Sequence, residues 1–477
     1  MDEMRKRLVT FAIGLVGATA LATGAFAQDA LTENPLAQDS GFEEEQQAVE
    51  PGVEPTVEAD ARFDEAFPVM VSEPLVQGDI APPGPVQGTW SQAQVEELIA
   101  YIGAIGAEGL NSEDYEAEAL AQVLAVNGPG EEVNAHATKI FRWLVEDLRD
   151  GRTPMSERVQ WFVVDPDRDR FRTRALVEEV MAGASVAETL NKLHPKHPDY
   201  AALRDELAVT PLEEADKRKL IRANMDRWRW LARDLGKQYL MTNVPEYQLR
   251  LTVADKIIST YRTVVGKPGR TATPQLAETV SGVVFNPTWT VPQSIVKGEG
   301  LGERVLGNPA WARSKGYVAT RGANGYISVV QRPGPTNSLG RMKLEMPNRH
   351  AIFFHDTPSR HLFNNNMRAL SHGCIRTERA LELAITMAIL GKGATKEEAV
   401  RIATSGEYTK VMIEKKMPAY ITYFTYGVDI DGNLREFKDI YGRDKPVLAS
   451  LDKPRVQNRS GISDDEVIVI ENNPLAG

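Results

Sequence analysis

Two residues whose side chains could carry out covalent chemistry, His355 and Cys374, lie 19 positions apart in this sequence of 477 residues. Cys374 is the only cysteine, and a lone cysteine is most simply explained as a small buried core residue. A cysteine nucleophile needs a base that takes its proton and donors that hold the developing oxyanion. The string Ser371-His372-Gly373-Cys374-Ile375-Arg376, with His355 upstream, offers both and favours a nucleophile.

The elements around this string are predicted to place the two side chains at a cleft. His355 ends the apolar run Ile352-Phe353-Phe354, which is typical of a strand. The stretch 377–390 has helical periodicity, so Cys374 is predicted to lie just ahead of a helix N-terminus, where the dipole favours a thiolate. Gly373 permits unusual backbone angles. Three consecutive backbone N–H groups could then face an oxyanion: those of His372, Gly373 and Cys374.

The whole chain predicts an α+β protein, in which an N-terminal helical scaffold domain (89–240) precedes a β-rich catalytic domain (241–447). The first helix should begin at a capping box of Ser91 and Gln94, and a later one at Thr210-Pro211. After residue 245 the hydrophobic period changes to two. Strands are predicted at 247–253, 257–265, 280–286, 326–331, 351–355 and 420–426. Residues 290–340 are rich in glycine, proline and asparagine, which predicts a long lid loop.

Both ends of the chain are predicted to lie outside these domains. Residues 1–27 combine a basic run, an apolar stretch and the site Ala25-Phe26-Ala27, which is typical of a cleavable signal peptide. Export to the periplasm of a Gram-negative bacterium is therefore expected. Residues 28–88 contain 14 acidic residues and one basic residue up to position 81, which favours a disordered linker. Residues 448–477 are expected to form a flexible tail.

Charge and histidine spacing argue against two other kinds of site. The net charge of -11 is concentrated in the linker, so the folded part is nearly neutral and nucleic-acid binding is not expected. His194 and His197 have the spacing of half a metal site, but two prolines interrupt a helix there and no further ligand is evident. No metal is therefore expected.

Other aromatic residues have simpler interpretations. Trp228 and Trp230 are predicted to be core residues rather than a sugar-stacking platform, because they lie in a stretch with helical spacing. His350 and His361 are predicted to lie at the surface.

The motif around Cys374 resembles the signature of the L,D-transpeptidase (YkuD) catalytic domain, in which an upstream histidine precedes Ser/Thr-His-Gly-Cys. Many members have asparagine two residues after the cysteine, whereas this chain has Arg376, as the large periplasmic YcbB-like members do. Further stretches resemble landmarks of that subfamily: 108–111, 197–200, 224–231, 265–268, 285–287, 337–340 and 439–444. One departure is that Leu207 leads almost directly to Pro211, which leaves no room for the usual peptidoglycan-binding domain.

The resemblance implies a role for each residue of the motif. Cys374 would attack the third residue of a tetrapeptide stem of peptidoglycan and expel the terminal D-alanine. His355, oriented by the backbone carbonyl of Asp356, would take the thiol proton. His372 is an alternative base, but its place beside the nucleophile suits backbone donation to the oxyanion better. Residues implied or considered in substrate binding are Arg376, which could instead form an internal ion pair, Ser371 and Asn337. The chemistry requires no metal or organic cofactor.

The acceptor that completes the reaction is left open by the sequence. The amine of a second stem would give a 3→3 cross-link, whereas an outer-membrane protein, a free D-amino acid or water would give attachment, exchange or hydrolysis. Without a peptidoglycan-binding domain, substrate docking would depend on the scaffold, the lid or a partner protein. A non-catalytic wall-binding protein is an alternative of another class, which the intact His355 and Cys374 disfavour. A papain-like protease would have its cysteine before its histidine, the reverse of the order here.

Overall fold

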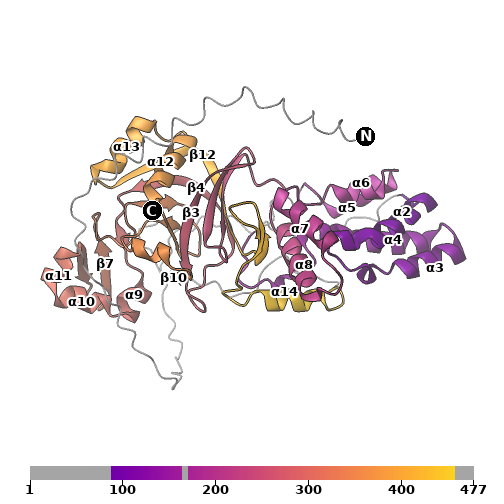
Figure 1. The fold of residues 1–477 in the computed structure, drawn as a ribbon, viewed down its shortest axis with the longest axis horizontal. Coiled ribbons are helices and arrows are strands. Elements are labelled where there is room, and N and C mark those ends of the chain that lie inside the picture. Colours follow the sequence, from indigo (N-terminus) through magenta and orange to yellow (C-terminus); the bar gives the residue numbers. More distant parts are fainter. Residues whose placement is uncertain (1–87, 164–169, 457–477) are drawn as a thin grey trace, which may run out of the picture. The chain divides into compact units, whose positions relative to one another are not determined.

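The computed structural model describes residues 88–163 and 170–456 (Figure 1). The predicted signal peptide, nearly all of the acidic linker and the end of the predicted tail therefore lie outside the described residues. An N-terminal helical region precedes a β-rich region, so the predicted α+β class is confirmed. No helix in the described ranges is both long enough and apolar enough to cross a membrane.

The helical region comprises a group of helices with a common core and two further helices that pack elsewhere. Its helices are α2 (Gln92–Ala104), α3 (Ala117–Asn127), α4 (Glu131–Asp150), α5 (Thr173–Met181), α6 (Val186–Asn191), α7 (Pro198–Val209) and α8 (Ala215–Arg229). Ser91 begins α2 through the predicted capping box with Gln94, and Val95, Leu98 and Ile102 are buried on one face. Helices α2 to α6 bury their apolar faces together in one cluster.

Helices α7 and α8 pack instead on the β-rich region. Trp228 and Trp230 are buried in a cluster that also contains Tyr239 of the first strand and Phe424 near the C-terminal end of the chain. The prediction that both tryptophans are core residues is confirmed. The predicted helix start at Thr210-Pro211 is wrong, because the Thr210 N–H and hydroxyl both donate to Glu206 O and so close α7.

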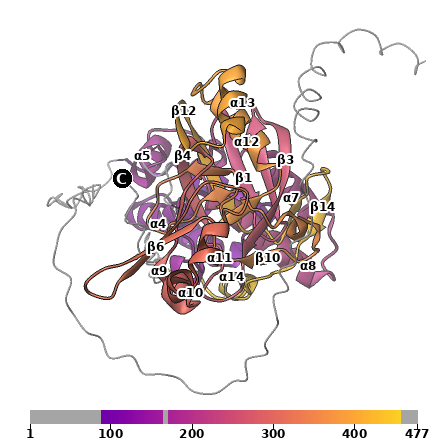
Figure 2. The same cartoon turned by 90° about the vertical axis from the view of Figure 1, so that its left-hand side faces the viewer.

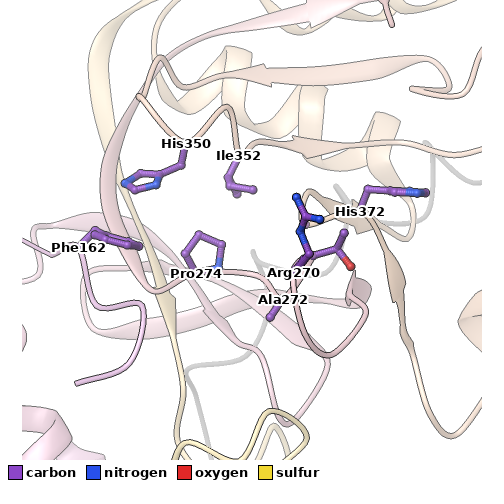
Figure 3. A pocket seen from close by; sticks show the side chains of 9 residues that line it. Phe162, Arg270, Ala272, Pro274, His350, Ile352 and His372 are labelled. Atoms are coloured by element: carbon purple, nitrogen blue, oxygen red, sulfur yellow. The ribbon is translucent and has the colours of Figure 1, made fainter. Parts of the chain in front are cut away.

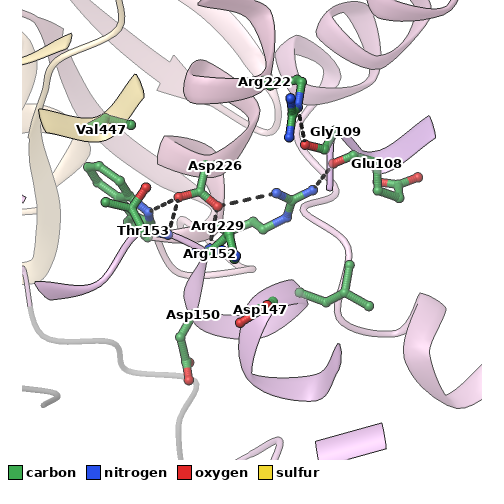
Figure 4. A network of polar contacts seen from close by, with 12 residues as sticks. Glu108, Gly109, Asp147, Asp150, Arg152, Thr153, Arg222, Asp226, Arg229 and Val447 are labelled. Carbon is green, nitrogen blue, oxygen red and sulfur yellow. Dashed lines mark hydrogen bonds and ion pairs between the residues drawn. The ribbon is translucent and has the colours of Figure 1, made fainter. Parts of the chain in front are cut away.

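A buried carboxylate ties α8 to the end of α4 (Figure 4). Asp226 accepts hydrogen bonds from the backbone N–H groups of Arg152 (2.6 Å) and Thr153 (3.0 Å) and from Trp230 Nε1 (3.1 Å). It also forms an ion pair with the buried Arg229 at 3.5 Å. The Arg229 guanidinium in turn donates to the backbone carbonyl of Glu108. This network joins three segments that are distant in sequence.

Replacing Asp226 by alanine is expected to lower the free energy of unfolding by about 3–5 kcal/mol, because it leaves the Arg229 charge and three N–H groups buried without this partner. Urea unfolding at pH 7 measures the loss. Asp216→Ala on the first turn of the same helix is the matched control, since its carboxylate is exposed. Similar small losses in both variants would show that the network contributes little.

Nine strands in the described ranges form one mixed sheet. They are β1 (Gln238–Asn243), β2 (Gln248–Val253), β3 (Lys256–Gly266), β4 (Leu276–Phe285), β8 (Met342–Glu345), β9 (Phe354–His355), β10 (Ala369–Ser371), β11 (Ile375–Thr377) and β12 (Thr409–Thr422). The order is β10-β3-β11-β9-β8-β4-β12-β1-β2, and β2 also pairs with β3, so the sheet closes on itself as a barrel does. The predicted strands 247–253 and 257–265 correspond to β2 and β3, joined by a turn with positive φ at Ala254 and Asp255.

Helix α12 (Ala380–Leu390) packs its apolar residues into the same core as the strands of the sheet. Leu383, Ala384 and Met387 are fully buried, and the helix lies against β4, β8 and β12 (Figure 1). Its neighbour α13 (Lys396–Ser405) begins at a capping box of Thr395 and Glu398. The long β12 runs on from α13 and pairs with both β4 and β1.

Residues 289–331 form a small folded subdomain rather than the predicted loop. It contains β5 (Trp289–Thr290), α9 (Gln293–Gly298), α10 (Leu301–Gly307), α11 (Pro309–Ser314), β6 (Tyr317–Arg321) and β7 (Ile327–Gln331), and Figure 2 shows its helices grouped with β6. Val291, Val296, Val305 and Val329 belong to its separate apolar core. The stretch looked like a loop because its helices have only six or seven residues, too few for a clear period.

The first part of the predicted tail is also ordered. Strands β13 (Tyr426–Val428) and β14 (Leu434–Glu436) lead to α14 (Asp444–Leu451), which runs past the predicted boundary at 448. Beyond it, Arg455 forms ion pairs with Asp147 (3.0 Å) and Glu146 (2.6 Å) of α4. Residues 448–456 are therefore packed on the helical region, contrary to the predicted flexible tail.

Candidate active site

The sheet brings His355 and Cys374 onto neighbouring strands. His355 ends β9, and Cys374 immediately precedes β11, which pairs with β9 in parallel, Arg376 opposite His355. Paired residues, and residues two apart along a strand, share one face of a sheet. Cys374, Arg376 and His355 therefore lie on the same face, and the Ile375 N–H donates to Phe353 O at 3.0 Å to hold this register.

His355 is held in one orientation and one tautomer. It is 6% exposed, and its Nδ1 lies 2.5 Å from the backbone carbonyl of Asp356. This is the carbonyl that was expected to orient the imidazole. Because a carbonyl only accepts, Nδ1 carries the proton and Nε2 is left with a lone pair. Burial lowers the pKa of His355 to about 3, and the positive charges of Arg376 and Lys343 act in the same direction. The imidazole is therefore a neutral base at physiological pH.

Cys374 is a protonated thiol in the resting site. Burial raises its pKa to about 11, although the Phe353 backbone and the charges of Lys343 and Arg376 oppose the rise. The Sγ atom lies 3.4 Å from the backbone carbonyl of Ala351, to which the thiol donates. The predicted position ahead of a helix N-terminus is wrong, because β11 follows the cysteine and α12 begins only at Ala380. Two nearby cations, rather than a helix dipole, favour the thiolate.

Alkylation of Cys374 by iodoacetamide is expected to accelerate about tenfold for each pH unit between pH 6 and 9, because only the thiolate reacts and its pKa lies near 11. The raised thiol pKa means that the fraction of thiolate is small throughout this range and grows with pH. Intact mass spectrometry of timed samples gives the rate. A rate that levels off above pH 5 would instead indicate a resting thiolate–imidazolium pair.

Lys343 is a residue of the site that the sequence analysis did not identify. It lies opposite His355 in the pairing of β8 with β9, and its Nζ is 4.4 Å from the centroid of the Phe353 ring. Lys343, His355 and Arg376 thus form one row across three strands. The alternation of apolar and charged residues in Met342-Lys343-Leu344-Glu345 was the available signal, but four residues are too few to predict a strand.

The turn before Cys374 is stabilised from within. Gly373 has φ 118°, a region that favours glycine. The Ser371 hydroxyl donates to Cys374 O at 2.6 Å and accepts the Gly373 N–H at 3.2 Å. Ser371 is only 2% exposed, and its hydroxyl shapes the turn; its part in substrate binding stays a prediction. The predicted Gly373 oxyanion donor is likewise already bonded, which leaves the N–H groups of His372 and Cys374.

Asn337 makes structural contacts in a turn, and its role in substrate binding stays a prediction. It is fully buried, with Nδ2 donating to Pro287 O (3.0 Å) and Arg332 O (2.9 Å) and Oδ1 accepting the Leu339 N–H (2.8 Å). These bonds brace the base of the 289–331 subdomain.

The two remaining histidines near the motif differ in position. His372 is exposed, and its Nε2 lies 2.8 Å from Glu299 at the end of α9, so the subdomain reaches the catalytic motif. His350 is buried, contrary to prediction, because its ring packs on Phe162 with 4.2 Å between centroids. Both line a small pocket behind the motif, with Phe162 and His350 at one end and Arg270 and His372 at the other (Figure 3).

The described ranges contain no cluster of three histidine, cysteine or acidic side chains arranged to hold a metal ion. His194 and His197, whose spacing resembles half a metal site, have other contacts. His197 stacks on Trp228 with 4.3 Å between ring centroids, and His194 lies 3.1 Å from the Tyr101 hydroxyl. Pro198, expected to interrupt a helix, instead occupies the first turn of α7 with His197 as its N-cap.

Comparison with known proteins identifies both regions. Residues 87–207 match a scaffold domain, and residues 237–413 match the L,D-transpeptidase catalytic domain, YkuD. A Haemophilus influenzae protein, described provisionally as an L,D-transpeptidase, is 29% identical over 223 residues. The alignment spans 44% of this chain and 45% of the relative, less than half of either.

Two solved structures give distant matches. An L,D-transpeptidase from Mycobacterium smegmatis is 11% identical, with a TM-score of 0.21 over 39% of this chain and 58% of that one. L,D-transpeptidase 1 of Mycobacterium tuberculosis is 10% identical, with a TM-score of 0.18 over 39% and 61%. On the two domain matches, the chain carries an L,D-transpeptidase (YkuD) catalytic domain behind a scaffold domain.

Proposed function

We propose that this protein is a peptidoglycan L,D-transpeptidase that joins two stem peptides by a 3→3 cross-link through a thioester on Cys374. The observation that carries the proposal is that Cys374 immediately precedes the strand that pairs with the strand of His355, whose Nδ1 is bonded to Asp356 O. This arrangement leaves Nε2 as the base for the thiol, within a domain that belongs to the YkuD family.

In the first half-reaction, Cys374 Sγ attacks the carbonyl carbon of the third residue of a tetrapeptide stem, while the thiol proton passes to His355 Nε2. The carbonyl oxygen becomes an oxyanion, which the backbone N–H groups of Cys374 and His372 stabilise. The carbon–nitrogen bond then breaks, and His355 returns the proton to the amine of the departing D-alanine. Because thiol and imidazole are both neutral at rest, proton transfer accompanies attack.

In the second half-reaction, the side-chain amine of another stem attacks the thioester. His355 takes a proton from that amine, the carbon–sulfur bond breaks and the thiol is restored. The same steps with a protein amine, a free D-amino acid or water give attachment, exchange or hydrolysis. The acceptor choice is assigned to the 289–331 subdomain, because Glu299 contacts His372 beside the nucleophile.

Arg376 is proposed to bind a carboxylate of the donor stem. It shares a sheet face with Cys374 and His355, and the peptide stem is an anionic substrate whose carboxylates suit a guanidinium. The proposal includes periplasmic location after cleavage of the N-terminal export signal, since peptidoglycan lies outside the cytoplasmic membrane. A partner that presents an amine, such as an outer-membrane protein, remains an alternative acceptor within this proposal.

Incubation of the purified protein with a disaccharide tetrapeptide, followed by mass spectrometry, tests the proposal. A cross-linked dimer with loss of one D-alanine is the expected product. Tripeptide alone would assign hydrolysis, and incorporation of an added D-amino acid would assign exchange. The absence of every product under reducing conditions, together with retained binding to peptidoglycan, would favour a non-catalytic wall-binding protein.

A further inference from the structure

The peptide bond between Gly373 and Cys374 carries the N–H group nearest in sequence to the nucleophile. In a planar trans peptide the C=O and N–H bonds point in opposite directions. Whatever holds the Gly373 carbonyl therefore also aims the Cys374 N–H. The glycine itself has no side chain to restrict this peptide, and its φ of 118° is open to few other residues.

The Gly373 carbonyl is held by Thr273, a residue 100 positions upstream. The Thr273 hydroxyl donates to Gly373 O at 2.7 Å and accepts the Gly266 N–H at 2.9 Å. Thr273 is 0% exposed, so no solvent replaces these bonds. Gly266 permits this approach, because a Cβ there would lie 1.9 Å from Thr271 O. Because the Thr273 hydroxyl oxygen accepts the Gly266 N–H, its own hydrogen is directed toward the Gly373 carbonyl.

The backbone of Thr273 is in turn held by the segment after β14. The Tyr441 hydroxyl accepts the Thr273 N–H at 3.3 Å and donates to Gly266 O at 2.6 Å, and Arg443 Nη2 donates to Thr273 O at 3.0 Å. Both residues lie beyond position 413, where the match to the catalytic domain ends. The support of the turn thus comes partly from outside that domain.

We propose that Thr273 is a positioning residue of the oxyanion hole. Its hydroxyl, supported by Tyr441 and Arg443, holds the Gly373–Cys374 peptide so that the Cys374 N–H faces the oxygen of the attacked carbonyl. This inference rests on the proposed function, since it assumes attack by Cys374 on a carbonyl. It assigns Thr273 no contact with substrate.

Two reactions of the same thiol test the proposal. Acylation by a carbapenem passes through an oxyanion, whereas alkylation by iodoacetamide displaces iodide and forms none. Thr273→Val keeps the shape of the side chain but removes the hydroxyl. Acylation of this variant should slow by roughly 10- to 1,000-fold; the upper end is the cost of removing one oxyanion-hole donor entirely. Alkylation should stay near the wild-type rate. Thr273→Ser restores the donor and should recover most of the acylation rate.

Further variants separate positioning from general damage. Thr242→Val is the matched control, because Thr242 is a fully buried sheet threonine whose hydroxyl has no partner in the described ranges. Should Thr273→Val fail to fold, Tyr441→Phe removes the hydroxyl that supports Thr273. This variant should lower the acylation rate by a smaller factor than Thr273→Val and leave the alkylation rate unchanged. Equal acylation in wild type and Thr273→Val, or a parallel fall in alkylation, overturns the positioning role. A wild-type protein that is neither acylated nor active overturns the proposed function and this inference together.

Discussion

Replacement of Cys374 by alanine is expected to abolish cross-linking, since the proposed mechanism places the acyl group on this residue, the one cysteine of the sequence. Loss of a nucleophile from a comparable catalytic unit costs on the order of 10⁶-fold in kcat, so the product should fall below detection. The measurement is dimer formation from disaccharide tetrapeptide, followed by mass spectrometry. Intact mass after incubation with a carbapenem should show one adduct on wild type and none on the variant.

The fold should survive this change. Cys374 is only half-buried at the edge of the core, and its thiol makes one long contact with Ala351 O. Thermal unfolding of Cys374→Ala should therefore resemble that of wild type, which separates lost chemistry from lost structure. Turnover retained in a folded Cys374→Ala protein would remove the thioester from the mechanism.

Replacement of His355 by asparagine is expected to lower kcat by about 10²–10⁴-fold, the usual contribution of a positioned general base. The thiol has a pKa near 11, so without the imidazole of His355 its proton is expected to pass to solvent. The residual rate should rise with pH, because hydroxide then supplies the thiolate that His355 no longer forms. Single-turnover acylation between pH 6 and 9 measures both effects.

His361→Asn is the matched control for His355→Asn. His361 is an exposed histidine of the 3-10 turn Arg360–Asn364 and lies outside the row of Lys343, His355 and Arg376. Its replacement should leave acylation unchanged. An equal loss in both variants, or a normal rate in His355→Asn, would transfer the role of base to another group, with His372 as the first alternative.

Residues whose contacts depend on a turn are the hardest to interpret from sequence. Ser371 and Asn337 are polar residues near the motif, and both were assigned to substrate because polar groups in a motif often bind ligands. In the structure their side chains satisfy backbone groups of tight turns, as buried polar groups generally must. The helix expected next to Cys374 begins later because a three-residue strand, β11, separates them. Neither feature has a period that a sequence could display.

Larger features were predictable in proportion to their regularity. The capped helix α2, the β2–β3 hairpin and the change from helical to strand period all appear where local spacing repeats over several residues. The 289–331 subdomain was not recognised, because each of its elements is short and becomes stable only in the shared core around Val291 and Val329. His350 was misplaced for a similar reason, since Phe162 covers it from a distant part of the chain.

The sequence by itself determined the chemistry available to this protein. One thiol, one upstream imidazole and a glycine turn are properties of residue type and spacing; they sufficed to predict the catalytic domain, and they make Cys374 the proposed nucleophile. Only the tertiary structure decided how that chemistry is set up: a neutral thiol and imidazole, two flanking cations and a turn held by Thr273. Burial and hydrogen-bond direction depend on neighbours that the fold brings together from far along the chain, which no local pattern encodes.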